Sequence, residues 1–189
     1  MGRKRVIIFS VLVLIAAGAA YMLAAYISGG PPFSGRSGKK AGSTEVNYPE
    51  KAQVNLYFAD NENVYLRSEQ RSVPHPPDPA EFGRVIIESL IKGPMGELVR
   101  TIPEDASLKA FYIAKDGTAY ADFTGAIRDK HPGGSSSELM TIYSIVNSLV
   151  MNISEIRTVK ILIDGQESMT LAGHVDLRFP FKVNTALAK

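Results

Sequence analysis

The chain has 189 residues, of which 45% are hydrophobic, so it can hold one ordinary domain and an appendage. The net charge is +2, but the part after residue 45 has 15 basic and 18 acidic residues, so we expect no nucleic-acid partner. The absence of cysteine excludes disulfides, thiolate metal ligands, cysteine nucleophiles and lipid-modified cysteine anchors.

The first predicted element is an apolar transmembrane helix over residues 6–27, preceded by a basic stub over residues 1–5. These 22 residues without a charge would form a helix of about 33 Å, which matches the hydrocarbon core of a bilayer. Because the basic residues lie on one side only, we expect a single-pass anchor in the cytoplasmic membrane. The N-terminus would lie in the cytoplasm and the rest in the periplasm or another extracytoplasmic space. A cleavable signal peptide is the alternative, and a buried core helix is a third reading.

Three further regions follow along the chain. Residues 28–45 are rich in glycine, serine and proline, which indicates a flexible linker. Residues 46–183 have the patterning of a folded domain, which the predicted anchor would place outside the cytoplasm, and residues 184–189 are expected to be a tail.

The folded part should begin with two strands and a helix. Residues 54–58 alternate between apolar and other side chains, and residues 64–73 predict a second, irregular strand. Asp78 is placed to cap the helix, with Glu81 completing a capping box, and Gly93-Pro94 should end it. The apolar spacing predicts its buried face, namely Phe82, Val85, Ile86, Ser89 and Leu90.

A hairpin is predicted next, from apolar runs at residues 108–114 and 118–123. If Asp116-Gly117 is a two-residue turn, Ala114 pairs with Ala119 and one face of the hairpin is wholly apolar. The opposite face would be open unless one of the first two strands or residues 177–181 covered it. As an exposed patch of aromatic and charged side chains, it is the candidate interaction face. Its residues are Phe111, Ile113, Tyr120, Lys109 and Asp122.

The last two core elements are a helix from Ser135 and a strand over residues 157–163. Ser135 and Glu138 have the spacing of a capping box. From residue 79 onward the order is helix, strand, strand, helix, strand. This order predicts an α+β fold, a two-layer sandwich with two helices packed on one face of a small mixed sheet.

The sequence shows no motif of catalysis or cofactor binding. None of the three histidines is spaced for a helical metal pair. His174 with Asp164 and Asp176 could form a hydrolytic site only with a nucleophile or metal motif, and none accompanies them. We therefore expect a protein that is not an enzyme, with no cofactor and no metal.

Six motifs together resemble the GerMN domain family of sporulation and spore-germination proteins. They are VNLYFAD at 54–60, EQRSVP at 69–74, LIKGP at 90–94, YSIVNSL at 143–149, VKILIDG at 159–165 and LAGHVDL at 171–177. Ser148 departs from the threonine usual there, and the lipobox cysteine of several relatives is missing, so the chain would be a membrane-anchored single-domain member. The resemblance implies a non-enzymatic cell-envelope role and a fold like that of ring-building domains. It also implies that the distinctive motif residues are structural, namely Gly93, Pro94, Asn147, Asp164, Gly165, Gly173 and His174.

Two main functional hypotheses follow. The first is a membrane-anchored extracytoplasmic scaffold or interaction module of the bacterial cell envelope, which binds other envelope proteins or copies of itself. The alternative is a module that binds cell-wall peptidoglycan or glycan, with Tyr65 and Tyr120 as stacking platforms. A hydrolase is the third hypothesis.

Overall fold

The structure is a computed structural model that describes residues 50–189. The predicted anchor at 6–27 and linker at 28–45 lie outside these residues. Within 50–189, no helix combines the length and apolar character needed to cross a bilayer. The elements in chain order are β1 (Lys51–Ala59), β2 (Leu66–Pro74), α2 (Pro79–Ile91), β3 (Leu108–Ile113), β4 (Thr118–Phe123), α3 (Ala126–Asp129), α4 (Ser135–Val150), β5 (Thr158–Ile163) and the 3-10 turn η1 (Thr185–Leu187).

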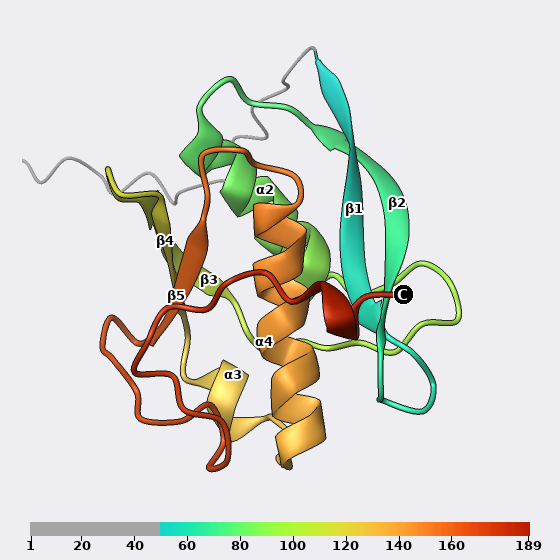
Figure 1. Ribbon diagram of the computed structural model, residues 1–189, viewed down its shortest axis with the longest axis vertical. Helices are drawn as coiled ribbons and strands as arrows, with labels where there is room; N and C mark the ends of the chain where they lie inside the picture. Colours follow the sequence, from blue (N-terminus) through green and yellow to red (C-terminus); the bar gives the residue numbers. More distant parts are fainter. Residues whose placement is uncertain (1–49) are drawn as a thin grey trace, which may run out of the picture. The chain divides into compact units, whose positions relative to one another are not determined.

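The strands form two separate sheets (Figure 1). β1 and β2 are an antiparallel pair, and the second sheet has the order β3-β4-β5. In the second sheet β3 is antiparallel to β4, whereas β4 and β5 are parallel, so the predicted mixed sheet is confirmed. The predicted helix-strand-strand-helix-strand order is also confirmed from α2 to β5, with the short α3 added between β4 and α4.

The helices α2 and α4 lie between the two sheets, with β1–β2 on one side and β3–β5 on the other (Figure 1). The prediction of two layers is therefore incomplete, because the β1–β2 pair adds a third. The reason lies in α4, which is buried on more than one side. Its buried residues are Glu138, Met140, Thr141, Ile142, Ser144, Ile145, Val146, Asn147, Ser148 and Leu149.

The helix α2 begins with the predicted Asp78 cap. Of its predicted buried face, Phe82, Ile86, Ser89 and Leu90 are buried and Val85 is partly buried, while Gly83 and Ile87 are buried in addition. The Asp78 carboxylate accepts hydrogen bonds from the main-chain N–H groups of Ala80 and Glu81, at 2.8 and 2.9 Å. One face of α2 contacts the three-stranded sheet closely. A Cβ atom at Gly83 would lie 2.2 Å from Cε1 of Phe111, so this glycine permits the close approach of α2 and β3.

The β3–β4 turn corrects the predicted hairpin. Gly117 N donates to Ala114 O at 3.0 Å and Ala114 N donates to Thr118 O at 2.9 Å, so the loop has three residues and not two. Gly117 has a φ of +83°, the left-handed conformation that such a loop requires at its last position. The register consequently shifts by one residue, and a shift of one exchanges the two faces of a strand.

The exchange reverses the placement of the hairpin side chains. Phe111 pairs with Ala121, is only 6% exposed and packs against α2, and Ile113 is partly buried against the same core. Tyr112 instead pairs with Tyr120 and is 49% exposed. The prediction that Phe111 and Ile113 share an open face with Tyr120 is wrong.

The C-terminal residues belong to the folded domain. Ala188 forms a bridge to Leu66 of β2, and Lys189 N donates to Leu66 O at 2.9 Å. Phe181 pairs with Val159 at the outer edge of β5. Residues 184–189 therefore complete the β1–β2 side and do not form a separate tail.

Candidate functional site

Polar side chains of α4 hydrogen-bond the main chain of the segments around it. Tyr57 N donates to Ser148 Oγ at 3.0 Å, and Ser144 Oγ donates to Tyr57 O at 2.5 Å. One turn further on, the Asn152 amide donates to Asn55 O at 2.9 Å and accepts from Asn55 N at 3.0 Å. Residues four apart lie on one face of a helix, so this polar stripe runs along β1 and satisfies the outward main-chain groups of Asn55 and Tyr57.

Asn147 makes the same kind of contact on another side of α4. Its side-chain amide donates to Asn184 O and accepts from Asn184 N, both at 3.0 Å. Asn147 is only 1% exposed, and its two hydrogen bonds hold the C-terminal segment against the helix. The buried amide thereby has partners for both of its polar atoms.

Glu138 is buried in the first turns of α4 and does not form the predicted capping box. The cap position of α4 is Gly134, which has no side chain to accept a hydrogen bond. Glu138 reaches instead to the loop after β5. Its carboxylate accepts from Val175 N at 2.8 Å, from His174 N at 3.2 Å and from His174 Nδ1 at 2.7 Å. Burial alone would raise the pKa of Glu138, but the hydrogen bonds from Val175, His174 and Ala172 together lower the pKa below its usual value.

His131 is held as a neutral imidazole beside this carboxylate. Gly133 N donates to His131 Nδ1 at 3.0 Å, so Nδ1 is an acceptor and the ring proton lies on Nε2. His131 Nε2 then donates to Thr141 Oγ1 at 2.9 Å, and that hydroxyl donates to Thr101 O at 2.5 Å. Burial lowers the pKa of His131 and the Glu138 charge opposes this shift. Both ring nitrogens are thus engaged, and neither is free to act as a general base.

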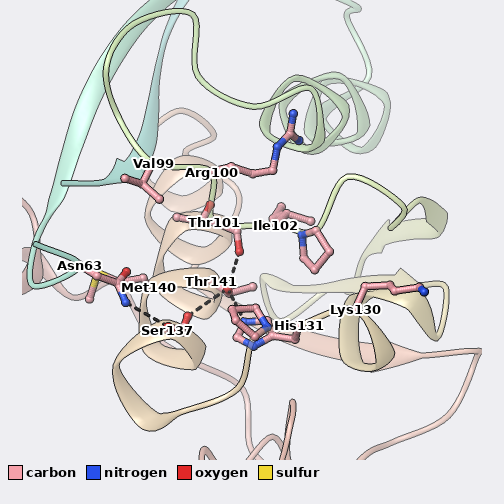
Figure 2. A pocket seen from close by; sticks show the side chains of 12 residues that line it. Asn63, Val99, Arg100, Thr101, Ile102, Lys130, His131, Ser137, Met140 and Thr141 are labelled. Atoms are coloured by element: carbon pink, nitrogen blue, oxygen red, sulfur yellow. Dashed lines mark hydrogen bonds between the residues drawn. The ribbon is translucent and has the colours of Figure 1, made fainter. Parts of the chain in front are cut away.

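His131, Thr141 and Thr101 form one wall of a pocket of about 240 Å³ (Figure 2). The pocket lies between the β1–β2 turn, the loop before β3 and the start of α4. In Figure 2, His131 points toward Thr141, whereas Arg100 and Lys130 point away from that hydrogen-bonded wall. Arg100 Nη2 donates to Lys92 O at 3.0 Å, at the end of α2. Residues 50–189 contain no cluster of three histidine, aspartate or glutamate residues suited to a metal ion.

Sequence reasoning did not find this wall, because His131 and Thr141 are ten residues apart across a loop. Glu138 and His174, which do not line the pocket, are separated by 36 residues, and only the fold brings them together. Among these residues only Glu138 had a local signal, its capping-box spacing from Ser135, and that signal indicated a main-chain partner at the start of α4 and not the loop after β5.

The outer face of the three-stranded sheet carries the part of the predicted interaction face that is exposed. The rings of Tyr112 and Tyr120 are stacked, with centroids 4.7 Å apart and planes at 8°. Lys109 forms an exposed ion pair with Asp164, with a distance of 3.0 Å between Nζ and Oδ1. Asp122 is buried and accepts from Gly165 N at 2.7 Å, so it fixes the turn after β5 and is not available to a partner.

The comparisons with known proteins identify the domain. The family model described as Germane, sporulation and spore germination, matches residues 55–168, which is more than half of the chain. The chain belongs to the Germane (GerMN) family. The resemblance found in the sequence is thereby confirmed, whereas membrane anchoring is a separate matter. The comparison with curated proteins finds no match.

The solved structures that share the fold of this GerMN domain include the following three. A candidate lipoprotein from Clostridium perfringens is 25% identical with a TM-score of 0.52, and the match covers 70% of this chain and 87% of that one. The tandem GerMN domains of the sporulation protein GerM from Bacillus subtilis are 22% identical with a TM-score of 0.59. That match covers 70% of this chain and 46% of the other. The first GerMN domain of the same protein is 20% identical with a TM-score of 0.53, and the match covers 71% of this chain and 98% of that one. The two likenesses under 25% identity establish the fold alone.

Apart from Asn147, which is buried within α4, the motif residues of this GerMN domain lie at turns and helix ends. Gly93 follows the last turn of α2 with a φ of +86°, and Pro94 comes next. Asp164 and Gly165 have φ values of +53° and +78° in the turn after β5. Gly173 has a φ of +113° in the loop that Glu138 and His174 hold.

Proposed function

We propose that this GerMN domain is an extracytoplasmic interaction module of the bacterial cell envelope, anchored by the apolar segment at residues 6–27. The family description and the candidate lipoprotein among the similar structures support an envelope location. The observation that carries the proposal is the stacked pair of Tyr112 and Tyr120, which stands on the sheet face opposite the helices. Tyrosine is enriched in protein interfaces because a large apolar ring ends in a polar hydroxyl.

The contacts of the buried polar side chains favour binding over catalysis as the function of this domain. The buried polar side chains of α4 are engaged with the main chain of this domain, as are Glu138 and Asp122. Tyr112 is a large side chain that is 49% exposed, and its ring stacks on the ring of Tyr120. These observations support a surface that binds a partner as the working part of the domain.

Binding of cell-wall glycan is the second candidate, and the ring contacts speak against it. A sugar stacks on a free ring face. Lys189 Nζ lies 3.4 Å from the ring centroid of Tyr65, and Tyr112 covers one face of Tyr120. Both tyrosines that the sequence suggests as platforms are thus partly occupied.

Two measurements on the full-length chain separate these functions. The first is co-sedimentation with purified peptidoglycan, and the second is light scattering alone and with detergent-solubilised envelope proteins. We expect no co-sedimentation, and complexes that Tyr112→Ala reduces at least about fivefold. Phe179→Ala is the matched control, because Phe179 is 69% exposed on the C-terminal segment. Peptidoglycan binding by a strictly monomeric chain would overturn the proposal.

A further inference from the structure

One side of the helix α2 is left open by the rest of the domain. Its inner side packs on the core through residues such as Phe82, Ile86 and Leu90. On its other side, positions three and four residues apart are exposed or partly exposed, and such positions lie on one face of a helix. This outer stripe consists of Glu81, Arg84, Val85, Glu88, Ile91 and the C-cap residue Lys92.

The charged side chains of the outer stripe alternate in sign along the helix. From the N-terminal end the order is negative, positive, negative and positive, at Glu81, Arg84, Glu88 and Lys92. Opposite charges four residues apart can pair within one helix. The ion pairs within residues 50–189, however, include none that involves Arg84, Glu88 or Lys92. These three charges are therefore available to a partner.

This order of charges complements that of a second copy whose α2 runs in the opposite direction. If a two-fold axis crosses the stripe at the level of Ile86, residues equally far from that level on either side face each other. Arg84 then faces Glu88 of the second copy, and Glu81 faces Lys92 of the second copy to within one residue. Each of these unlike pairs occurs twice. In a parallel pair each residue would face its own counterpart, so like charges would meet, and the charge pattern therefore selects the antiparallel arrangement.

A hollow beside the outer stripe has the lining that an arginine side chain needs. It has a volume of about 290 Å³ and lies between α2 and the start of β3. Its lining combines apolar and charged side chains, namely Glu88, Ile91, Lys92, Ser107 and Leu108. In the antiparallel pair Arg84 of the second copy comes opposite Glu88. Its aliphatic stem can then lie on the apolar part of the lining while its guanidinium reaches the Glu88 carboxylate. The Lys92 ammonium faces Glu81 of the second copy instead.

We propose that α2 forms an antiparallel, two-fold contact with α2 of a second copy of this chain. Arg84 and Glu88 form the ion pairs, and Val85 lies beside the axis against Val85 of the other copy. A contact along one helix of 13 residues is small for a stable dimer, but the anchor proposed above confines both copies to one membrane surface and raises their effective concentration. The proposal goes beyond the proposed function, because the tyrosine pair lies on the sheet face opposite the helices. The dimer therefore presents two tyrosine surfaces at once.

Disulfide trapping is a direct test, because the chain has no cysteine of its own. Val85→Cys in the full-length chain places one thiol beside the two-fold axis, within reach of the same thiol in the second copy. Oxidation of membranes from cells that express this variant should give a covalent dimer on a non-reducing gel. Ser72→Cys, at an exposed position of β2, is the matched control and should give at least about fivefold less dimer. Equal amounts from both positions, or no dimer from Val85→Cys, would refute the proposal.

Charge exchange tests the pairing without a disulfide, by light scattering of the purified full-length chain over a concentration series. Arg84→Glu or Glu88→Arg alone should weaken the dimer at least about tenfold, because like charges then meet across the contact. The double variant exchanges the two charges and should restore the dimer to within about threefold of the parent. A double variant as weak as the single variants would show that Arg84 and Glu88 do not face each other, which contradicts the proposal. Tyr112→Ala should leave the dimer unchanged, so a failure of this contact is distinguishable from a failure of the proposed function.

Discussion

His131 and Glu138 show how single ionisable residues hold the start of α4. Each accepts hydrogen bonds from main-chain N–H groups of a loop that has no regular structure of its own. A buried carboxylate is tolerated only where such donors replace the water it has lost. The loops at Gly133 and at His174 consequently take one conformation, fixed by the helix beside them.

The neutral state of His131 gives the domain a defined pH dependence. The pKa of His131 is lowered from 6.5, so as the pH falls the unfolded chain takes up its proton before the folded chain does. Stability is therefore full above about pH 6.5 and is lost as the pH falls through the interval down to the lowered pKa. Protonation also removes the acceptor for Gly133 N–H, a bond worth on the order of 1 kcal/mol. Urea denaturation at pH 8 and pH 5 measures the effect.

His131→Asn is the matched variant for this measurement. Its side-chain oxygen can accept from Gly133 N–H, and it does not titrate. The change in the free energy of unfolding between the two pH values should be smaller for the variant. An equal change in both proteins would show that His131 does not contribute.

At the residue scale, sequence patterns located polar residues but not their partners. The spacing of Ser135 and Glu138 indicated a cap, whereas Glu138 binds residues 36 and 37 positions away. The loop at His174 also contains Gly173, which has a positive φ, and a glycine in the sequence can suggest such a turn. No local pattern states which buried carboxylate will satisfy that loop.

At the scale of elements, the contact of α2 with β3 shows how loop length decides which face of a strand is buried. The three-residue turn at Gly117 places Phe111 under α2, directly against Gly83. A two-residue turn would have placed Tyr112 there. Composition indicated the hairpin correctly, but one residue of loop length determined its faces.

Gly83→Ala tests this packing with a change whose sign is diagnostic. In an unconstrained helix, alanine is favoured over glycine by about 1 kcal/mol. Here the added Cβ would lie 2.2 Å from the Phe111 ring, so we expect a net destabilisation of about 1–2 kcal/mol in urea denaturation. In the background of Phe111→Leu, the same change should cost much less.

Gly96→Ala is the control for the glycine change. Its nearest atom would be a Glu69 carboxylate oxygen 4.0 Å away, so the stability should change by less than about 0.5 kcal/mol. If Gly83→Ala stabilises the protein, Phe111 does not pack on α2 and the two-residue turn is restored as the better description.

At the scale of the whole domain, the arrangement of layers decides where a partner can bind. The helices are covered by sheets on both sides (Figure 1). Side chains at the end of α4 and just after it bond the edge of β1, and the C-terminal residues bond Leu66 at the start of β2. The outer face of β3 and β4 is left with its tyrosines, next to the uncovered β3 edge. The helix-strand order could be predicted from local periodicity. The third layer could not, because it depends on long-range contacts of polar side chains such as Ser148.

The central claim is that the Tyr112 side of the sheet is the working surface of this GerMN domain. Photocrosslinking in living cells tests it most directly, with p-benzoylphenylalanine in place of Tyr112 in the full-length chain. The account predicts a discrete crosslinked adduct with an envelope protein at this position. The same probe in place of Ser72, an exposed residue of β2, should give none. Equal adducts from both positions, or an adduct from Ser72 alone, would contradict the account.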